Sequence, residues 1–249
     1  MVFCQNMLPS RNPPAPIPSP PILSRTSLPP DRRLVLPPSG LVVLIDKESG
    51  WTSFDVVARS RTIFKTKKIG HAGTLDPLAT GLLVVCTGKA TKLVHRFVAQ
   101  TKEYHATIRL GEITASWDAE TEVLERRAVP DFDGDRLRAA AQRFTGRLRQ
   151  IPPMYSARKV EGERLYKLAR QGRTIEREPK EVEVYRFDIV SVAIPDIDAM
   201  ITCSKGTYVR SLAHDFADSL GCGGHLMKLR RLAVGDFRVE DALRIQELA

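Results

Sequence analysis

Proline is distributed so unevenly along this chain of 249 residues that only part of it can build a packed core. Eleven of the 17 prolines lie in residues 1–40, in runs such as Pro13-Pro14-Ala15-Pro16. Proline lacks a backbone donor and favours extended, polyproline-like conformations. We therefore expect residues 1–40 to be a disordered tail, or to result from a start codon assigned too far upstream. The folded domain is expected at residues 41–249.

Targeting, membrane and metal signals are weak throughout the sequence. A secretory leader needs an early basic segment followed by a continuous apolar stretch, which residues 1–40 do not provide. The longest apolar run, residues 81–86, is far shorter than the ~18 residues of a membrane-spanning helix. The cysteines at 4, 86, 203 and 222 have the spacing of neither a zinc site nor a disulfide framework. We expect a cytoplasmic protein that binds neither metal nor membrane.

The charge balance favours a polyanionic partner without identifying one. The chain has 38 Lys and Arg against 29 Asp and Glu, a formal net charge of +9. Such an excess is common in proteins that bind nucleic acid, but it also occurs on ordinary solvated surfaces. Charge alone therefore does not decide the function.

Hydrophobic periodicity indicates the α+β class. Short alternating or buried-type strands are interspersed with amphipathic helices, without a regular βαβ rhythm, so we expect a mixed or largely antiparallel sheet. The expected strands are residues 41–45, 82–86, 104–110, 182–192, 200–203 and 225–234. The expected helices are residues 53–64, 91–98, 133–144, 162–171 and a last one that ends near residue 220.

The most informative segment is GHAGTLDPLATG, residues 70–81, which we expect to be a loop before a buried strand. Pro77 fixes its own φ and restricts Asp76 to an extended conformation, which orients the carboxylate. Such a carboxylate can serve as a nucleophile or a base. It can equally bond only to neighbouring amides in an Asx-turn, which these residues alone favour. The phosphate-binding patterns GxxxxGK[ST] and GxGxxG are absent.

This segment resembles the catalytic loop of the TruB-type tRNA pseudouridine synthases. The similarity continues in family order through KATKLVHRFV, KEYHATIRLGE, IPPMYSARKVEGERLYKLARQG, SKGTYVRSLAHDFADSLGCGGHL and LRRLAVGDF. It implies the pseudouridine-synthase catalytic fold, a mixed central sheet flanked by helices. It also implies isomerisation of a uridine in the T-loop of tRNA (position 55) without a cofactor.

The resemblance assigns roles to individual residues. Asp76 matches the catalytic aspartate, and Arg210 matches the arginine that pairs with it, holding it ionised by lowering its pKa. Tyr104 matches the active-site tyrosine, whose ring can stack on the extruded uracil and whose phenol can help to remove the C5 proton. An ordinary core tyrosine and a surface arginine are the structural alternatives.

Further positions match substrate contacts. His71 matches the histidine that fills the space left by the flipped nucleotide, although a turn histidine is the simpler interpretation. Tyr208 matches a substrate-contacting tyrosine, and Leu229 an apolar wall of the uracil pocket. The basic residues that match the family's RNA path are Lys47, Lys159, Arg230 and Arg231.

Two features depart from the family pattern. The segment TASWD has Ala115 in place of the first acidic residue of the family's TDTxD pattern, but it keeps the second acidic residue, Asp118. Trp117 is unusual at its position, and it could stack on RNA or anchor the loop. We also expect no C-terminal PUA domain, because the sequence ends just after the matched region, and we expect a monomer.

Other functions fit parts of the same sequence. A guide-directed, dyskerin-like pseudouridine synthase would use the same catalytic residues together with a PUA domain and protein partners. A non-catalytic RNA-binding protein that helps tRNA to fold would fit the charge, but retention of Asp76, Tyr104 and Arg210 argues against it. A small-molecule enzyme fits least well.

Overall fold

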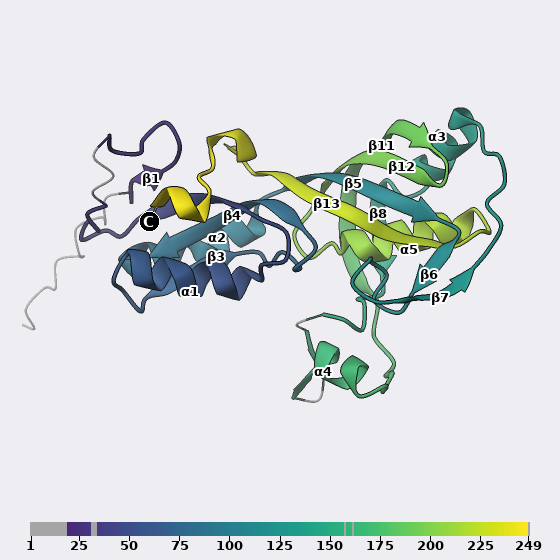
Figure 1. Ribbon diagram of the computed structural model, residues 1–249, viewed down its shortest axis with the longest axis horizontal. Coiled ribbons are helices and arrows are strands. Elements are labelled where there is room, and N and C mark those ends of the chain that lie inside the picture. Colours follow the sequence, from purple (N-terminus) through teal and green to yellow (C-terminus); the bar gives the residue numbers. More distant parts are fainter. Residues whose placement is uncertain (1–18, 31–33, 157, 161, 249) are drawn as a thin grey trace, which may run out of the picture.

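The computed structural model describes residues 19–30, 34–156, 158–160 and 162–248. A ten-stranded mixed sheet runs through the elongated body (Figure 1), with the order β1-β2-β4-β13-β5-β12-β11-β8, β3 added to β4 and β14 to β13. Most neighbouring pairs are antiparallel, whereas β1 with β2 and β4 with β13 are parallel. The expected α+β class with a mixed, largely antiparallel sheet is confirmed.

Most expected elements are present, with shifted ends. The large strands are β2 (Val42–Lys47), β4 (Thr80–Thr87), β5 (Lys102–Leu110), β11 (Lys180–Ala193), β12 (Asp196–Cys203) and β13 (Gly224–Val234). The α-helices are α1 (Ser53–Ile63), α2 (Val94–Ala99), α3 (Gly134–Gln142), α4 (Leu165–Arg170) and α5 (Val209–Ser219). Within the described residues, sequence periodicity missed the short strands, which are too brief to show a repeat: β1 (Ile22–Leu23), β3 (Ile69–Ala72), β6 (Glu112–Thr114), β7 (Val123–Arg126), β8 (Gly146–Gln150), β9 (Lys159–Val160), β10 (Glu163–Arg164) and β14 (Phe237–Arg238).

The loop expected at residues 70–81 is shorter than predicted. Ile69–Ala72 pairs antiparallel with β4, and β4 already begins at Thr80, so the loop proper is residues 73–79. The prediction was wrong at both ends because glycine and histidine in this strand give no strand-like alternation.

The proline-rich segment is not uniformly tail-like, contrary to expectation. Residues 1–18 and 31–33 lie outside the described part of the chain. Ile22–Leu23, however, pairs parallel with β2, and Leu23 is buried in the main core. The Arg25 amide donates to the Asp241 carbonyl at 2.7 Å. Isolated leucines between prolines can still pack when a sheet edge offers backbone partners.

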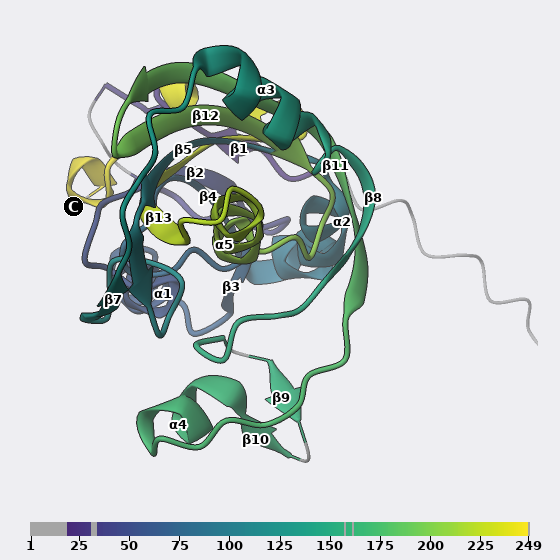
Figure 2. The same ribbon diagram turned by 90° about the vertical axis from the view of Figure 1, so that its right-hand side faces the viewer.

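The centre of the sheet brings distant segments together. β13 pairs with β4 at only two positions, Arg230 with Thr80 and Arg231 with Gly81. β5 lies on the other side of β13 and places Tyr104 opposite Arg231. Gly81 has a φ of +98°, and a Cβ there would lie 2.2 Å from the Arg231 carbonyl oxygen, so only glycine permits this approach. α5 lies along the concave side of the curved sheet (Figure 2).

Candidate active site

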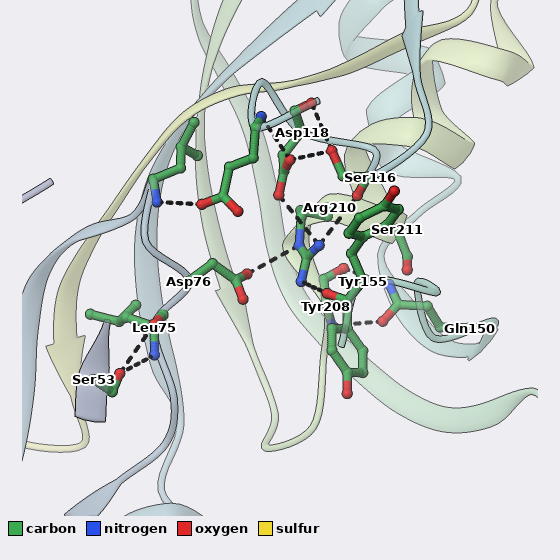
Figure 3. Close-up of polar contacts among 12 residues, drawn as sticks. Ser53, Leu75, Asp76, Ser116, Asp118, Gln150, Tyr155, Tyr208, Arg210 and Ser211 are labelled. Atoms are coloured by element: carbon green, nitrogen blue, oxygen red, sulfur yellow. Dashed lines mark hydrogen bonds and ion pairs between the residues drawn. The ribbon is translucent and has the colours of Figure 1, made fainter. Parts of the chain in front are cut away.

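The loop at residues 73–79 is fixed by α1. Thr52 caps this helix, and Asp55 completes the capping box. Ser53, in the first turn, donates its hydroxyl to the Leu75 carbonyl at 3.1 Å and accepts the Leu75 amide at 2.9 Å (Figure 3). These two bonds place Asp76, the next residue, at the edge of a pocket.

Lys47 also fixes this loop, and its predicted contact with RNA is wrong. The residue is 1% exposed. Its Nζ donates to the carbonyls of Glu48 at 2.9 Å, Trp51 at 2.6 Å and Pro77 at 3.3 Å. Burial lowers the pKa of Lys47 to about 8. Lys47 therefore supports the backbone beside Asp76, because its ammonium group binds carbonyls of residues 48–51 and of the loop at once.

Arg210 is the centre of the polar network in Figure 3. Its side chain comes from the first turn of α5 and is almost fully buried. Nε lies 3.0 Å from Oδ2 of Asp76, and Nη1 lies 3.3 Å from Oδ2 of Asp118. Nη1 also donates to the Ser116 carbonyl at 3.2 Å, and Nη2 to the Tyr155 carbonyl at 2.9 Å. The guanidinium thus joins two carboxylates instead of forming a fork with one.

The electrostatics of Asp76 differ from the prediction. Desolvation by burial raises the pKa of Asp76, and the neighbouring Asp118 charge acts in the same direction. Arg210 and Lys47 oppose this rise without cancelling it. Arg210 lowers the pKa of Asp76, as predicted, but the cost of taking the carboxylate out of water is larger, so the pKa of Asp76 is raised overall.

Asp118 is a site residue that sequence reasoning did not select. It is fully buried, and its Oδ1 accepts the Ser116 hydroxyl and, at 3.0 Å, the Glu120 amide. The Glu120 carboxylate in turn accepts the Leu78 amide at 2.7 Å, which ties this turn to the catalytic loop. The retained acidic position in TASWD was the available signal for Asp118.

Four predicted site residues line the same pocket as Asp76. The pocket has a volume of ≈ 310 Å³, and the four are Tyr104, Tyr208, Arg210 and Leu229. Tyr104 is 8% exposed, and burial raises its pKa, so the phenol is neutral near pH 7. Tyr208 is the N-cap residue of α5. The structure thus brings together residues from the catalytic loop, β5, α5 and β13.

Arg231 lies in this pocket too, and its predicted contact with RNA phosphates is wrong. The residue is 1% exposed, and its Nε donates to the Leu82 carbonyl at 2.6 Å. Its Nη2 donates to the Gly73 carbonyl at 3.1 Å. The charge of the Arg231 guanidinium also lowers the pKa of Tyr104, which opposes the rise that burial causes. Arg231 therefore supports the catalytic loop and the tyrosine from within the protein.

The remaining predicted residues lie outside the pocket lining. His71 is in β3, where its Nδ1 is buried without a hydrogen-bond partner among the described residues. Burial, and then the Arg231 charge, lower the pKa of His71. Arg230 pairs with both carboxylate oxygens of Asp46, at 3.0 and 2.8 Å, and its side chain is 40% exposed. Lys159 falls in β9, but its side chain is outside the described part of the structure.

In the described ranges, no group of three or more His, Cys, Asp or Glu side chains could hold a metal ion. No helix in those ranges is both long and apolar enough to cross a bilayer. The cysteines at 86, 203 and 222 are buried free thiols.

Two family models match this chain, one after the other, over residues 61–249. Residues 61–209 match the model of the TruB family pseudouridylate synthase N-terminal domain, and residues 210–249 match that of the tRNA pseudouridylate synthase B C-terminal domain. The chain belongs to the TruB family of pseudouridylate synthases. The boundary between these two matches falls inside α5, one residue after its start, so it does not separate two structural units here.

Curated members of the TruB family are similar over most of the chain. The tRNA pseudouridine synthase B of Thermobifida fusca is 49% identical over 216 residues, which cover 84% of this chain and 74% of that protein. The enzyme of the same name from Opitutus terrae is 49% identical over 207 residues, with 83% and 86% coverage.

Solved structures are similar as well. A chain from the crystal structure of the archaeal box H/ACA sRNP Nop10-Cbf5 complex has a TM-score of 0.63 and 28% identity. The likeness covers 85% of this chain and 53% of that chain.

Proposed function

We propose that this pseudouridine synthase converts the uridine at position 55 in the T-loop of tRNA into pseudouridine, with Asp76 as the nucleophile. The observation that carries the proposal is the ion pair of Asp76 with the buried Arg210, 3.0 Å apart, at the wall of a pocket that also holds Tyr104. The pocket volume, ≈ 310 Å³, suits one extruded nucleotide base.

The chemistry is an isomerisation that balances without a redox partner. Asp76 bonds to the nucleotide and the C1′–N1 bond breaks, which detaches the uracil. The uracil then turns, C5 bonds to C1′, and the bond to Asp76 breaks, which regenerates the carboxylate. C5 then loses its proton and N1 gains one. Tyr104 enters the reaction as a neutral phenol whose ring can face the uracil. Late in the reaction, a general base must remove the C5 proton. Leu229 supplies an apolar wall to this pocket.

Binding of tRNA is assigned to residues around the pocket. Tyr208 and His71 are proposed to contact the flipped nucleotide and the space that it leaves, and Arg230 is proposed to reach a phosphate with its partly exposed guanidinium. We place the enzyme in the cytoplasm, where its three described thiols stay reduced, and expect it to act as a monomer.

Release of tritium from tRNA labelled at uridine C5 tests the proposal directly, because pseudouridine formation displaces that hydrogen. The expected result is release with the wild-type enzyme and none with Asp76→Asn, although both bind tRNA. Binding without release by the wild type would favour the non-catalytic RNA-binding protein instead.

The guide-directed alternative rests on the likeness to the chain of the H/ACA sRNP complex. The higher identity to proteins named tRNA pseudouridine synthase B favours an enzyme that acts on tRNA alone. Release of tritium from purified tRNA without added guide RNA or protein would support this choice, and a strict requirement for a guide would overturn it.

A further inference from the structure

Trp117 occupies an unusual place in the turn that follows β6. Its φ is +63°, in the left-handed region that costs a non-glycine residue on the order of 1 kcal/mol. The Trp117 amide donates to the Thr114 carbonyl at 3.4 Å, and its carbonyl accepts the Leu226 amide of β13 at 3.0 Å. The surrounding structure therefore maintains this conformation at one defined residue.

The indole ring is stacked between elements that are distant in the sequence. The His214 ring lies 4.5 Å from it, centre to centre, with an angle of only 7° between the planes. The guanidinium carbon of Arg177 lies 5.5 Å from the centre of the same indole. Aromatic stacking and a cation–π contact each contribute on the order of 1 kcal/mol, enough together to hold a turn in place.

The stack and the catalytic network share one face of α5. Arg210 and His214 are one helical turn apart, so their side chains lie on the same side of the helix. Ser116 and Asp118 bind Arg210, while Trp117, between them, packs on His214. Three consecutive residues of the turn thus dock on α5 together.

Arg177 connects this turn to the insertion at residues 151–179, which contains α4. In both overall views this insertion projects from the body of the molecule (Figures 1 and 2). Nη1 of Arg177 donates to the Pro152 carbonyl at 3.0 Å, which closes the base of the insertion. Tyr155, a few residues after Pro152, accepts Arg210 with its backbone carbonyl.

We propose that Trp117 is a positioning residue that fixes the turn holding Arg210 and joins that turn to the base of the 151–179 insertion. The proposal rests on the proposed function, since it concerns how Arg210 serves Asp76. Trp117 is not among the residues that line the pocket beside Asp76. It acts through Ser116 and Asp118, and it links the site to a part of the molecule that is free to contact RNA.

The pH dependence of kcat/KM distinguishes positioning from a merely structural role. The charged groups that act on Asp76 are Arg210 from α5, Asp118 from the turn and Lys47 from β2. In Trp117→Ala the turn is released and Arg210 is held less firmly, so its opposition to the raised pKa of Asp76 weakens. We expect kcat to fall about 10- to 100-fold and the acid limb of the profile to move to higher pH.

Two further variants keep this test decisive. Trp117→Phe retains a ring that can stack on His214, and we expect it to restore most of kcat and the wild-type acid limb. Tyr185→Ala removes a half-exposed aromatic residue of β11 away from the pocket and should change neither. A Trp117→Ala enzyme that folds and shows a lower rate with an unmoved acid limb would overturn the positioning role, as would a Trp117→Phe enzyme that behaves like Trp117→Ala.

A double-mutant cycle tests the link to the insertion. If Arg177 acts through Trp117, the variant carrying Trp117→Ala and Arg177→Gln should be no slower than Trp117→Ala alone. If the double variant loses rate by the product of the two single losses, the two residues act independently and the link is overturned. Tritium release by the wild-type enzyme, measured in the same series, separates failure of this inference from failure of the proposed function.

Discussion

At the scale of single residues, Asp76 shows a conflict between catalysis and stability. Its carboxyl has a raised pKa in the folded protein, so the folded state binds the proton more tightly than the unfolded state does. The ionised form therefore opposes folding. This cost is present at pH values above the folded pKa and disappears as the pH falls below the unfolded pKa. In the proposed function, the reaction needs a carboxylate at this place.

Asp76→Asn should therefore inactivate the enzyme without destabilising it. We expect a melting temperature at pH 7 equal to or above that of the wild type, because the neutral amide removes a poorly solvated charge. The difference should shrink as the pH falls and wild-type Asp76 becomes protonated. Thermal unfolding from pH 4 to pH 8 measures this, and a variant that melts several degrees lower at pH 7 would contradict it.

Arg210→Lys tests whether the shape of the guanidinium matters. Lysine keeps the charge but cannot reach Asp76, Asp118 and the carbonyls of Ser116 and Tyr155 at once. We expect kcat/KM to fall on the order of 100-fold and its acid limb to move to higher pH, because Asp76 is less well paired. An unchanged rate would show that a point charge is sufficient.

At the scale of elements, one side-chain amide holds the start of α5. It binds both the backbone N–H and the backbone carbonyl of a single residue, as a neighbouring strand would. Gln150, the last residue of β8, accepts the Tyr208 amide at 2.7 Å and donates to the Tyr208 carbonyl at 3.0 Å. The hydroxyl of Ser211 donates to the Ile151 carbonyl at 2.8 Å. The end of β8 and the first residue of the 151–179 insertion are thereby joined to α5, the helix that carries Arg210.

Gln150→Leu should lower the free energy of unfolding by about 1–3 kcal/mol, because the Tyr208 amide loses its partner and the Tyr208 carbonyl keeps only the Leu212 amide. Urea unfolding measures this change, and Gln142→Leu on the exposed side of α3 is the matched control. Equal stability of the two variants would mean that other groups replace the Gln150 amide.

At the scale of the whole molecule, the start of the described chain forms one edge of the sheet and lies beside the C-terminal residues. β1 adds to β2, and Arg25 bonds to the carbonyl of Asp241 near the C-terminal residues. Leu23 is 5% exposed in the main core, whereas Val35 is 80% exposed. Ile22 and Leu23, which the proline content of their segment assigned to a tail, are therefore part of the sheet.

Leu23→Ala should destabilise the protein by about 2–5 kcal/mol through lost burial and the cavity that remains. Val35→Ala should have almost no effect, since its side chain is already in solvent. Chemical unfolding of both variants provides the comparison. If the two are equally stable, the 22–23 segment does not pack on the sheet in solution.

The sequence by itself determined the class and the family, and it selected residues that meet in the fold. Alternating and buried-type strands identified the α+β fold, and the motifs that carry Asp76, Tyr104 and Arg210 meet in one pocket. Local patterns succeed here because each motif is continuous in the sequence, and because in the 70–81 segment glycine permits unusual backbone conformations while proline restricts them.

Only the tertiary structure decided what each charged side chain does. Lys47 and Arg231 look in the sequence like ordinary basic residues on an RNA path, yet both are 1% exposed and bind backbone carbonyls. Asp118 became a partner of Arg210, and burial raises the pKa of Asp76 although Arg210 lowers it. Burial and the balance of desolvation against pairing depend on contacts between β4, β5, β13 and α5, which are distant in the sequence and meet only in the folded chain.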